Sequence, residues 1–383
     1  MLCHSNDNGA HMARVVVFHT NLNLLGGGER VCLGFLKAAK GLGHTTELVT
    51  MVPPNWRRIA SFFGEATIPD RVISLFDRPK RFEKYRRFLM FSFSGQFRDA
   101  DTITVNSTGY RWLPVLADVV YEHTPPASLL RVPTGGMPIR KRMYYLPFDF
   151  AQLLFLRTSK DTTVLTNSTY CMRRLKPLVE RIRVAYPPVD VESYLCSKSS
   201  RDNTVVTCGR YDEGKNYELV LEVAEALDRL TFVIIGRSSG ELSQKYFEKL
   251  DAIRKAKNLS NVRLMQNASL SSLREIMASG KVYLHSMVAE DFGIAVVEGM
   301  ASGLVPVVHK SGGPWEDVLQ WGKYGYGYTS RGEAIEMVAE AVKSKRSREE
   351  LIQRAKDFTK EQFVEKIKGV LIEAMERKSI RLS

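Results

Sequence analysis

Residues 286–317 read SMVAEDFGIAVVEGMASGLVPVVHKSGGPWED, and this stretch decides the expected fold. An apolar strand ending at Leu284 leads into it, a loop follows, and the pattern predicts a helix from about Phe292 and Gly293. A second apolar strand is expected from Leu304 to Val308. A strand, a helix that begins at a glycine and another strand are typical of a parallel α/β sheet.

Two glutamates, Glu290 and Glu298, stand within this stretch. If the span between them were mostly helical, their carboxylates would lie ~12 Å apart along the helix axis, a spacing that suits a hexose and a ribose. The backbone N–H groups of Phe292, Gly293 and Ile294 would lie between them, at the positive helix end where phosphate binds well. This layout suits a nucleotide sugar. The alternative is a pair of solvated helix glutamates.

The chain of 383 residues exceeds the usual size of a single core, so two domains are expected. Residues 1–11 are interpreted as an expression-tag remnant, because a Gly-Ala-His-Met string ends at Met12. The proline-rich segment Tyr186–Asp190 and the polar run after it indicate a hinge between a domain at 12–186 and a domain at 187–358.

The cysteines and the hydropathy pattern bear on the compartment. The five cysteines are scattered and lack metal-ligand spacing, which favours a reducing compartment over a disulfide framework: Cys3, Cys32, Cys171, Cys196 and Cys208. No apolar run has the length of a membrane-spanning helix, and no secretory signal precedes the first strand. We therefore expect a cytoplasmic protein.

A glycine-rich turn follows the first expected strand, Val15–Phe18. Gly26–Gly28 open a helix that extends to about Lys40, and three glycines let the backbone come close to an anionic ligand. The turn lacks the G-x-G-x-x-G spacing and the P-loop lysine, which argues against dinucleotide or triphosphate binding. A tight turn without a ligand is the alternative. Further strands are expected at Glu47–Val49, Thr102–Val105, Val115–Tyr121 and Thr163–Leu165.

Two histidines, His19 and His123, fall at the carboxyl ends of strands, where ligands bind in parallel sheets. His123 stands in the segment YEHTPP, whose two prolines prevent regular continuation of the strand. A histidine fixed there can contact a sugar hydroxyl or a developing charge, although a purely structural role is equally compatible with the pattern.

The net charge is +13, and nearly all of the excess lies before residue 187. Basic residues alternate with aromatic ones in three segments, around residues 56–58, 78–91 and 139–145. This pattern favours an anionic membrane surface, because each Lys or Arg adds about 1 kcal/mol of attraction and aromatic rings prefer the interface. Nucleic acid is the second possibility, but no nucleic-acid-binding motif accompanies the clusters. The candidate membrane or acceptor residues are Arg57, Arg58, Arg81, Lys84, Arg86, Arg87, Arg140, Lys141 and Arg142.

A second α/β series follows the hinge. Its expected strands are Thr204–Thr207, Phe232–Ile235, Arg263–Met265 and Lys281–His285, and its expected helices are Tyr217–Leu230 and Ser271–Ala278. After the first of these strands stand two cations, Arg210 and Lys215, which can hold a diphosphate as its bond to a sugar breaks. The alternative is a pair of solvated side chains. Amphipathic helices at Glu333–Lys343, Glu350–Phe358 and Glu361–Arg377 close the chain.

With these motifs in place, the chain resembles the retaining glycosyltransferases of family 4, which have the GT-B fold. That fold consists of two Rossmann-like parallel-sheet domains facing a central cleft, with a C-terminal helix that returns to the N-terminal domain. The segments HTNLNLLGGGER, YEHTPP and FGIAVVEGMASGLVPVVHKSGGPWEDV are most similar to the subfamily of GDP-mannose-dependent α-1,2-mannosyltransferases that extend lipid-linked oligosaccharides. The resemblance implies that residues 359–383 cross back to the first domain.

The same resemblance implies the roles of the site residues. Arg210 and Lys215 would bind the diphosphate, Glu290 the hydroxyls of the transferred sugar, Glu298 the ribose, and His123 the sugar near its anomeric carbon. The remaining donor-binding residues would be Gly27 and Gly28 at the phosphates, Gln266 and Asn267 by the base, and Phe292, Gly293 and Ile294 through their amides.

The implied reaction moves a hexose, with retention of configuration, from a nucleotide sugar to a lipid-linked or glycan acceptor at the cytoplasmic face of a membrane. The cations would replace a metal, so no metal and no cofactor are expected. The alternatives are the same fold with a UDP-sugar donor, a sugar-nucleotide epimerase, and a non-catalytic basic nucleic-acid-binding protein.

Overall fold

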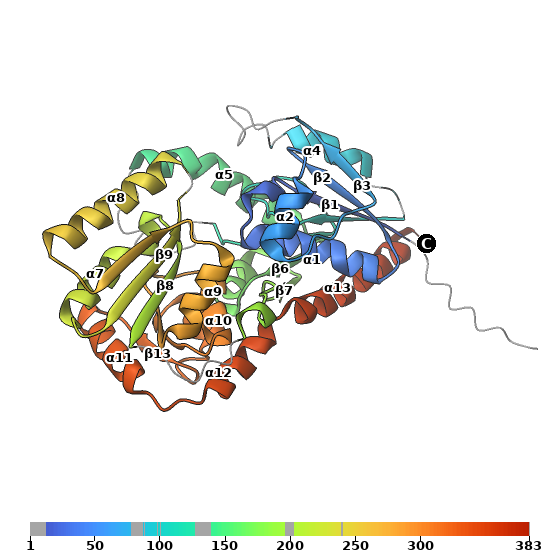
Figure 1. Cartoon of the computed structure of the whole chain (residues 1–383). Coiled ribbons are helices and arrows are strands. Elements are labelled where there is room, and N and C mark those ends of the chain that lie inside the picture. Colours follow the sequence, from blue (N-terminus) through green and yellow to red (C-terminus); the bar gives the residue numbers. More distant parts are fainter. Residues whose placement is uncertain are drawn as a thin grey trace, which may run out of the picture.

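The computed structural model describes residues 13–77, 87, 89–97, 99, 101–126, 139–195, 203–238 and 240–382. It contains two α/β domains, each built on a parallel sheet (Figure 1). The seven strands of the first sheet run in the order β3-β2-β1-β4-β5-β6-β7. Their bounds are β1 Arg14–His19, β2 Thr45–Thr50, β3 Arg71–Ser74, β4 Thr102–Asn106, β5 Val119–Glu122, β6 Thr163–Thr166 and β7 Ile182–Val184.

The second sheet has six strands in the order β10-β9-β8-β11-β12-β13. Their bounds are β8 Thr204–Arg210, β9 Thr231–Arg237, β10 Val262–Gln266, β11 Val282–His285, β12 Val305–His309 and β13 Tyr326–Tyr328. All pairings in it are parallel. In both sheets the chain order reverses beside the first strand of the domain, which is where doubly wound folds bind their ligands.

Helices connect the strands and cover the faces of both sheets. In the first domain they are α1 Gly27–Gly41, α2 Trp56–Phe63, α4 Leu89–Ser94, α5 Ile139–Thr158 and α6 Thr169–Leu175. In the second they are α7 Tyr217–Ala226, α8 Glu241–Ala256, α9 Leu270–Ser279, α10 Ile294–Ala301, α11 Arg331–Lys343 and α12 Arg348–Ala355, and α13 Lys360–Leu382 ends the chain.

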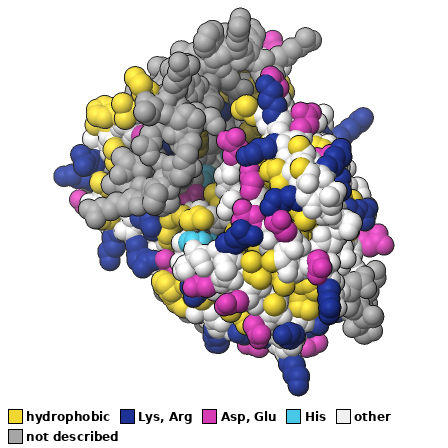
Figure 2. Space-filling model, turned by 90° about the vertical axis from the view of Figure 1, so that its left-hand side faces the viewer, with side chains coloured by type: hydrophobic (Ala, Val, Ile, Leu, Met, Phe, Trp, Pro, Cys, Tyr) yellow, Lys and Arg dark blue, Asp and Glu magenta, His cyan; other side chains and the backbone are white. Residues whose placement is uncertain are grey.

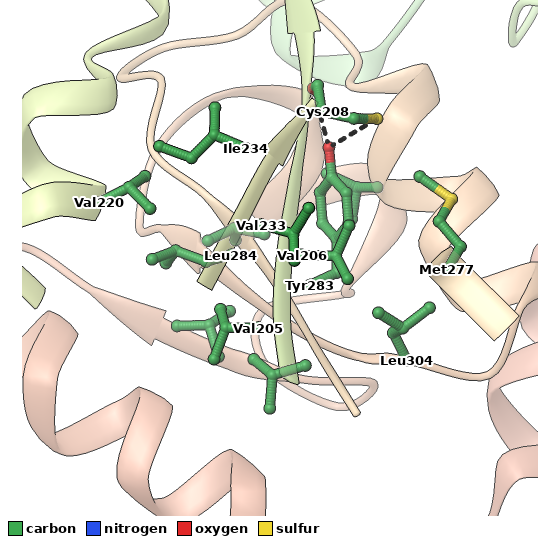
Figure 3. Close-up of a cluster of buried hydrophobic side chains, with 14 of the residues drawn as sticks. Val205, Val206, Cys208, Val220, Val233, Ile234, Met277, Tyr283, Leu284 and Leu304 are labelled. Atoms are coloured by element: carbon green, nitrogen blue, oxygen red, sulfur yellow. Dashed lines mark hydrogen bonds between the residues drawn. The ribbon is translucent and has the colours of Figure 1, made fainter. Parts of the chain in front are cut away.

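The central strands are apolar along most of their length because both faces of each sheet are covered. In the second domain Val205, Val206 and Leu284 are fully or nearly fully buried, and Figure 3 shows them packed between helices. The hydroxyl of Tyr283 in this cluster donates a hydrogen bond to the backbone oxygen of Cys208 at 3.2 Å and lies 3.7 Å from the Cys208 thiol. The buried hydroxyl is thus satisfied without water.

The C-terminal helix α13 returns to the first domain, as the resemblance implied, and lies beside α1 (Figure 1). The ring of Phe363 packs edge-on against Phe35 at 5.9 Å. A Cβ at Gly34 would lie 2.4 Å from that ring, so the close approach of the two helices needs a glycine there. Further along α13, Arg377 donates to the hydroxyl of Thr163 in β6. The predicted GT-B arrangement is confirmed.

Some predicted elements differ from the structure. The strand expected from Val115 begins only at Val119. Just before it, Asp118 bonds to β4 through its side chain, because its carboxylate accepts from the amide and the hydroxyl of Thr104 at 2.8 Å each. The helix α8 and the edge strands β3, β7 and β13 were not predicted. Residues 1–11, interpreted as a tag remnant, lie outside the described residues.

Candidate functional site

The centre of the candidate site is the pair Lys215 and Glu290. Lys215 ends a 3₁₀ turn just after β8, and its Nζ lies 2.5 Å from Glu290 Oε2. His285, the last residue of β11, lies 3.6 Å from the same carboxylate oxygen through Nε2. Burial alone would raise the pKa of Glu290, but the charge of Lys215 and the contact with His285 outweigh it, so the pKa lies well below its usual range. Glu290 is therefore an anion at neutral pH.

The two predicted cations lie at the same end of the sheet. Arg210 is the last residue of β8, exposed to solvent, and it pairs in register with Arg237 at the end of β9. No role was predicted for Arg237. It stands at the end of a strand as Arg210 does, and that position was the reason for naming Arg210 as a candidate. It crosses to the first domain, where it donates to the backbone oxygens of Leu24 and Leu25 at 3.3 and 3.2 Å. Burial and repulsion from Arg58 and Arg210 lower its pKa.

The N-termini of α1 and α10 meet across the domain boundary. A Cβ at Gly27 would lie 2.8 Å from Ile294 Cδ1, so the glycine-rich turn of the first domain touches the first residue of α10. The first-turn amides of a helix have no acceptor within that helix, and this arrangement brings two such sets close together. The structure thus brings the glycine-rich turn into contact with the helix that follows the Glu290 loop, and the predicted role of both in donor binding stays a prediction.

One geometric assumption was wrong. The span from Glu290 to Glu298 is not mostly helical, because α10 begins only at Ile294 and Gly293 precedes it with a φ of 86°. A Cβ at Gly293 would lie 2.8 Å from the Pro314 ring, so both this contact and the positive φ favour glycine at this position. The ~12 Å axial estimate therefore does not apply.

Glu298 lies within α10 and is buried. Its Oε1 lies 3.0 Å from Nη2 of Arg30, which comes from α1 of the first domain. Arg30 follows the three glycines of the glycine-rich turn, and no role was predicted for it. The predicted ribose acceptor is thus already held by a cation of the opposite domain.

His123 follows β5 and lies beside the start of α1. A Cβ at Gly28 would lie 3.7 Å from its ring. The ring Nε2 lies 2.8 Å from the backbone oxygen of Ser107, an acceptor, so Nε2 carries the proton. Burial lowers the pKa of His123 and keeps the ring neutral at physiological pH. The other predicted strand-end histidine, His19, is buried and contacts Glu29 and Ser107.

The turn predicted to lie by the base is held by its own side chains. Gln266 Nε2 donates to Ser238 and to Gln244, and Asn267 Oδ1 accepts from the amide of Ser238 at 3.0 Å. Asn267 has a φ of 52°, a conformation that asparagine tolerates. These bonds give the turn a fixed shape, and its role toward a base stays a prediction. The ring of Phe292 packs between Tyr186 and Phe358, which leaves only its backbone for the predicted contact with a donor.

The predicted basic clusters are described only in part. Arg57 and Arg58 are exposed on α2, and the Arg87 guanidinium lies 5.9 Å from the Trp112 ring. Arg81, Lys84 and Arg86 lie outside the described residues, and Arg140, Lys141 and Arg142 are placed in the first turn of α5 by their backbone alone.

An apolar stripe on α5 was missed by the sequence analysis. Four large side chains stand on one side of this helix and are exposed: Met143 at 69%, Leu146 at 66%, Phe150 at 67% and Leu154 at 50%. Their spacing of three and four residues places them in line. We call these four residues the α5 stripe. Figure 2 shows hydrophobic side chains exposed among basic and acidic ones on one face of the molecule.

Two carboxylates that the sequence analysis did not single out join the domains. Asp291 accepts from the Thr124 hydroxyl at 2.9 Å. Asp317 accepts from the amide of Thr169 at 2.8 Å and from the Tyr186 hydroxyl at 3.1 Å. No sequence signal distinguishes these residues from solvated acids, because their partners lie more than a hundred residues away.

Two kinds of feature are not found in the described part of the chain. No group of three or more His, Cys, Asp or Glu side chains there could hold a metal ion. No helix there has both the length and the hydropathy needed to cross a bilayer.

Comparisons with known proteins find similar sequences and structures. Residues 197–358 match the family model described as "Glycosyl transferases group 1". Among curated proteins, a GDP-Man:Man(3)GlcNAc(2)-PP-Dol alpha-1,2-mannosyltransferase of Yarrowia lipolytica is 39% identical over 90 residues, 24% of this chain and 14% of that protein. The protein of the same name from Candida glabrata is 24% identical over 265 residues, 60% of this chain and 52% of that protein. The chain thus matches about half of its curated relatives' length or less.

Solved structures confirm the fold. The sucrose-phosphate synthase of Thermosynechococcus elongatus superimposes with a TM-score of 0.71 at 13% identity, covering 97% of this chain and 100% of that chain. Anabaena HepE in complex with UDP gives a TM-score of 0.69 at 15% identity, covering 94% and 100%. At these identities the likeness concerns the fold alone.

Proposed function

We propose that this chain, whose residues 197–358 form a glycosyl transferases group 1 domain, is a retaining hexosyltransferase that uses a nucleotide sugar. The proposed donor is GDP-mannose, and the proposed acceptor is a lipid-linked or other glycan at a membrane surface. The observation that carries the proposal is the Lys215–Glu290 pair at the carboxyl end of the second sheet, beside the contact between Gly27 and α10. The names of the curated relatives support mannose and a lipid-linked acceptor.

The arrangement can separate the charges of the reaction. The exposed Arg210 and the ammonium of Lys215 are positioned to neutralise a departing diphosphate, together with the first-turn amides of α10. Glu290 remains ionised and can accept hydroxyls of the transferred sugar, while Glu298 offers its second oxygen to a ribose hydroxyl beside Arg30. A phosphate oxygen of the donor would then accept the proton of the acceptor hydroxyl on the same face of the sugar, which gives retention.

The cations of this site supply the positive charge that a metal ion would otherwise provide, so we propose a reaction that needs no metal and no cofactor. The matching measurement is the transfer rate with and without a chelator. An unchanged rate in the chelator supports this part of the proposal, and a loss that Mg²⁺ or Mn²⁺ restores contradicts it.

We further propose that the enzyme works on the cytoplasmic face of a membrane without crossing it. The α5 stripe supports this, because its four exposed side chains adjoin the basic first turn of α5 and could enter the interfacial region of a bilayer. Lys and Arg at the surface of the first domain would add attraction to anionic lipids. The chain therefore has both exposed apolar side chains and basic side chains with which to bind a membrane surface.

A donor screen followed by a transfer assay tests the proposed function. GDP, UDP, GDP-mannose and UDP-glucose are compared by thermal shift, and radiolabelled GDP-mannose is then offered with a lipid-linked oligosaccharide acceptor. We expect GDP and GDP-mannose to raise the Tm, and label to move to the acceptor in wild type but not in Glu290→Gln. A shift by UDP compounds alone would reassign the donor. Turnover of the donor without any acceptor would identify an epimerase, and absence of binding by any nucleotide would refute the proposal.

A further inference from the structure

The carboxylate of Asp291 bridges the two domains immediately beside Glu290. Its Oδ2 accepts from the Thr124 hydroxyl at 2.9 Å, and its Oδ1 lies 3.4 Å from the Cys171 thiol. Both partners belong to the first domain, and Thr124 directly follows His123. One side chain of the second domain is thus attached to the segment that carries the histidine of the first.

The attachment is stiff at the Thr124 end. The backbone oxygen of Thr124 accepts from Gln152 Nε2 at 2.9 Å, and the backbone oxygen of His123 accepts from Asn167 Nδ2 at 2.8 Å. These bonds hold the segment to α5 and to the start of α6. A displacement of Asp291 would therefore change its distance from the whole His123 segment rather than only from one hydroxyl.

The attachment is stiff at the Asp291 end as well. The amide of Gly313 donates to the backbone oxygen of Glu290 at 2.9 Å. A Cβ at Gly313 would lie 2.3 Å from the backbone oxygen of Asp291, so the loop is packed backbone against backbone. These contacts hold the backbone of both Glu290 and Asp291 against the loop at Gly313.

The domains are also joined by contacts that do not involve Thr124, on either side of Cys171 in α6. Asp317 accepts from the amide of Thr169 at the N-terminus of α6, and Glu316 pairs with Arg173 of the same helix. These contacts remain when Asp291 loses its partner, so the bridge from Asp291 is not needed merely to keep the domains together. Its distinctive property is its place between Glu290 and His123.

We propose that Asp291 is a positioning residue whose bond to Thr124 fixes the His123 segment at the distance from Glu290 that sugar transfer requires. The proposal rests on the proposed function and adds to it the residue pair that aligns the two halves of the site. A nucleotide held by the second domain would bind without this alignment, whereas transfer would depend on it.

The proposal predicts that transfer depends on pH, because Asp291 can be protonated. Burial raises its pKa to about 7, opposed by the Thr124 hydrogen bond and reinforced by the adjacent Glu290. The other groups that face it are the Cys171 thiol, the Arg111 guanidinium and the Tyr170 hydroxyl. The ionised carboxylate can accept from both Thr124 and Cys171, so the bridge is complete above pH 7 and weakens as the pH falls through it.

The decisive experiment compares Thr124→Val, which is nearly isosteric but lacks the hydroxyl, with Thr124→Ser, which keeps it. We expect Thr124→Val to lower kcat about tenfold, the effect of losing a hydrogen bond to a charged group, with the Kd for GDP unchanged and with kcat restored in Thr124→Ser. In wild type we expect kcat to fall as the pH drops through about 7. In Asp291→Asn, which has no carboxyl group to titrate, this fall should be absent. The matched control is Thr158→Val, because the Thr158 hydroxyl bonds only within α5.

Wild-type kcat in Thr124→Val, or an equal loss of kcat in Thr158→Val, would overturn the proposal. So would a loss of GDP affinity that matches the loss of kcat. Amide hydrogen exchange of residues 119–124 supplies a readout independent of catalysis: it should accelerate in Thr124→Val and stay unchanged in Thr158→Val. If wild-type protein transfers no sugar, the proposed function fails, and the exchange measurement still decides whether Asp291 orders this segment.

Discussion

Arg30 Nη2 and Glu298 Oε1 lie 3.0 Å apart and join α1 of the first domain to α10 of the second. Their side chains are only 16% and 8% exposed, so the pair is shielded from solvent. Glu298 is also the residue to which the resemblance assigns the ribose. The carboxylate that joins the two domains is therefore the one proposed to bind the ribose.

The first prediction concerns the coupling energy of this pair. In a double-mutant cycle with Arg30→Met and Glu298→Gln, the unfolding free energies should show a coupling of roughly 1–3 kcal/mol, because each single change leaves the other polar group buried without its partner. The exposed pair Arg183 and Glu373, at 46% and 41% exposure, is the control and should couple by less than about 1 kcal/mol. Equal coupling in the two cycles would contradict the expectation.

The second prediction concerns pH and the Lys215–Glu290 pair. The pKa of Glu290 in the folded protein is depressed below its ordinary value of 4.5, so the pair contributes stability that is present above about pH 4.5 and is lost as the pH falls. Lys215→Met should lower the free energy of unfolding by roughly 1–3 kcal/mol at pH 7 and by less at pH 4. Urea unfolding at both pH values measures the difference. The control is Lys245→Met, which removes the exposed partner of Glu241 and should change the free energy of unfolding little at either pH. An equal loss of stability at pH 4 and pH 7 in Lys215→Met would contradict this prediction.

The third prediction concerns the backbone that encloses the Glu290 loop. Gly313→Ala would place a Cβ 2.3 Å from the backbone oxygen of Asp291 and 2.7 Å from Phe292 Cα, and neither atom can move without shifting the loop. We expect a loss of about 1–3 kcal/mol of stability and weaker GDP binding. Gly332→Ala is the matched control, since nothing lies within 4 Å of a Cβ there. Thermal unfolding and calorimetric titration with GDP provide the two readouts, and normal GDP affinity in Gly313→Ala would count against this prediction.

The fourth prediction concerns the α5 stripe. Replacing Leu146 and Phe150 together by glutamate should strongly reduce flotation of the protein with anionic vesicles. Each lost apolar side chain weakens the contact by roughly 1.5–3 kcal/mol, and the new charges are repelled. Leu242→Glu in α8, where the side chain is 76% exposed in the other domain, should float like wild type. Unaltered flotation of the double variant would exclude the stripe as a membrane contact.

Much of the fold could be predicted from the sequence because its signals are local. Apolar strands of a doubly covered parallel sheet read as continuous hydrophobic runs, and glycines mark the starts of α1 and α10. The edge strands β3, β7 and β13 were missed because they are short, and none of them is buried along its whole length. The start of α10 was predicted to within two residues. The path of the loop before it, from Ala289 to Gly293, could not be predicted, because it is held by contacts with Gly312 and Gly313 that no local pattern encodes.

The sequence by itself indicated the candidate residues for the chemistry. Arg210 ends a strand, and Lys215 and Glu290 lie in loops after strands whose ends are recognisable from their neighbours. Only the tertiary structure decided which groups the acidic residues of the two domains contact. The attachment of Glu298 to Arg30 and that of Asp291 to Thr124 join segments from different domains, 268 and 167 positions apart. Hydrogen bonds and ion pairs act over a few ångströms, so such partners become visible only after both domains have folded and docked.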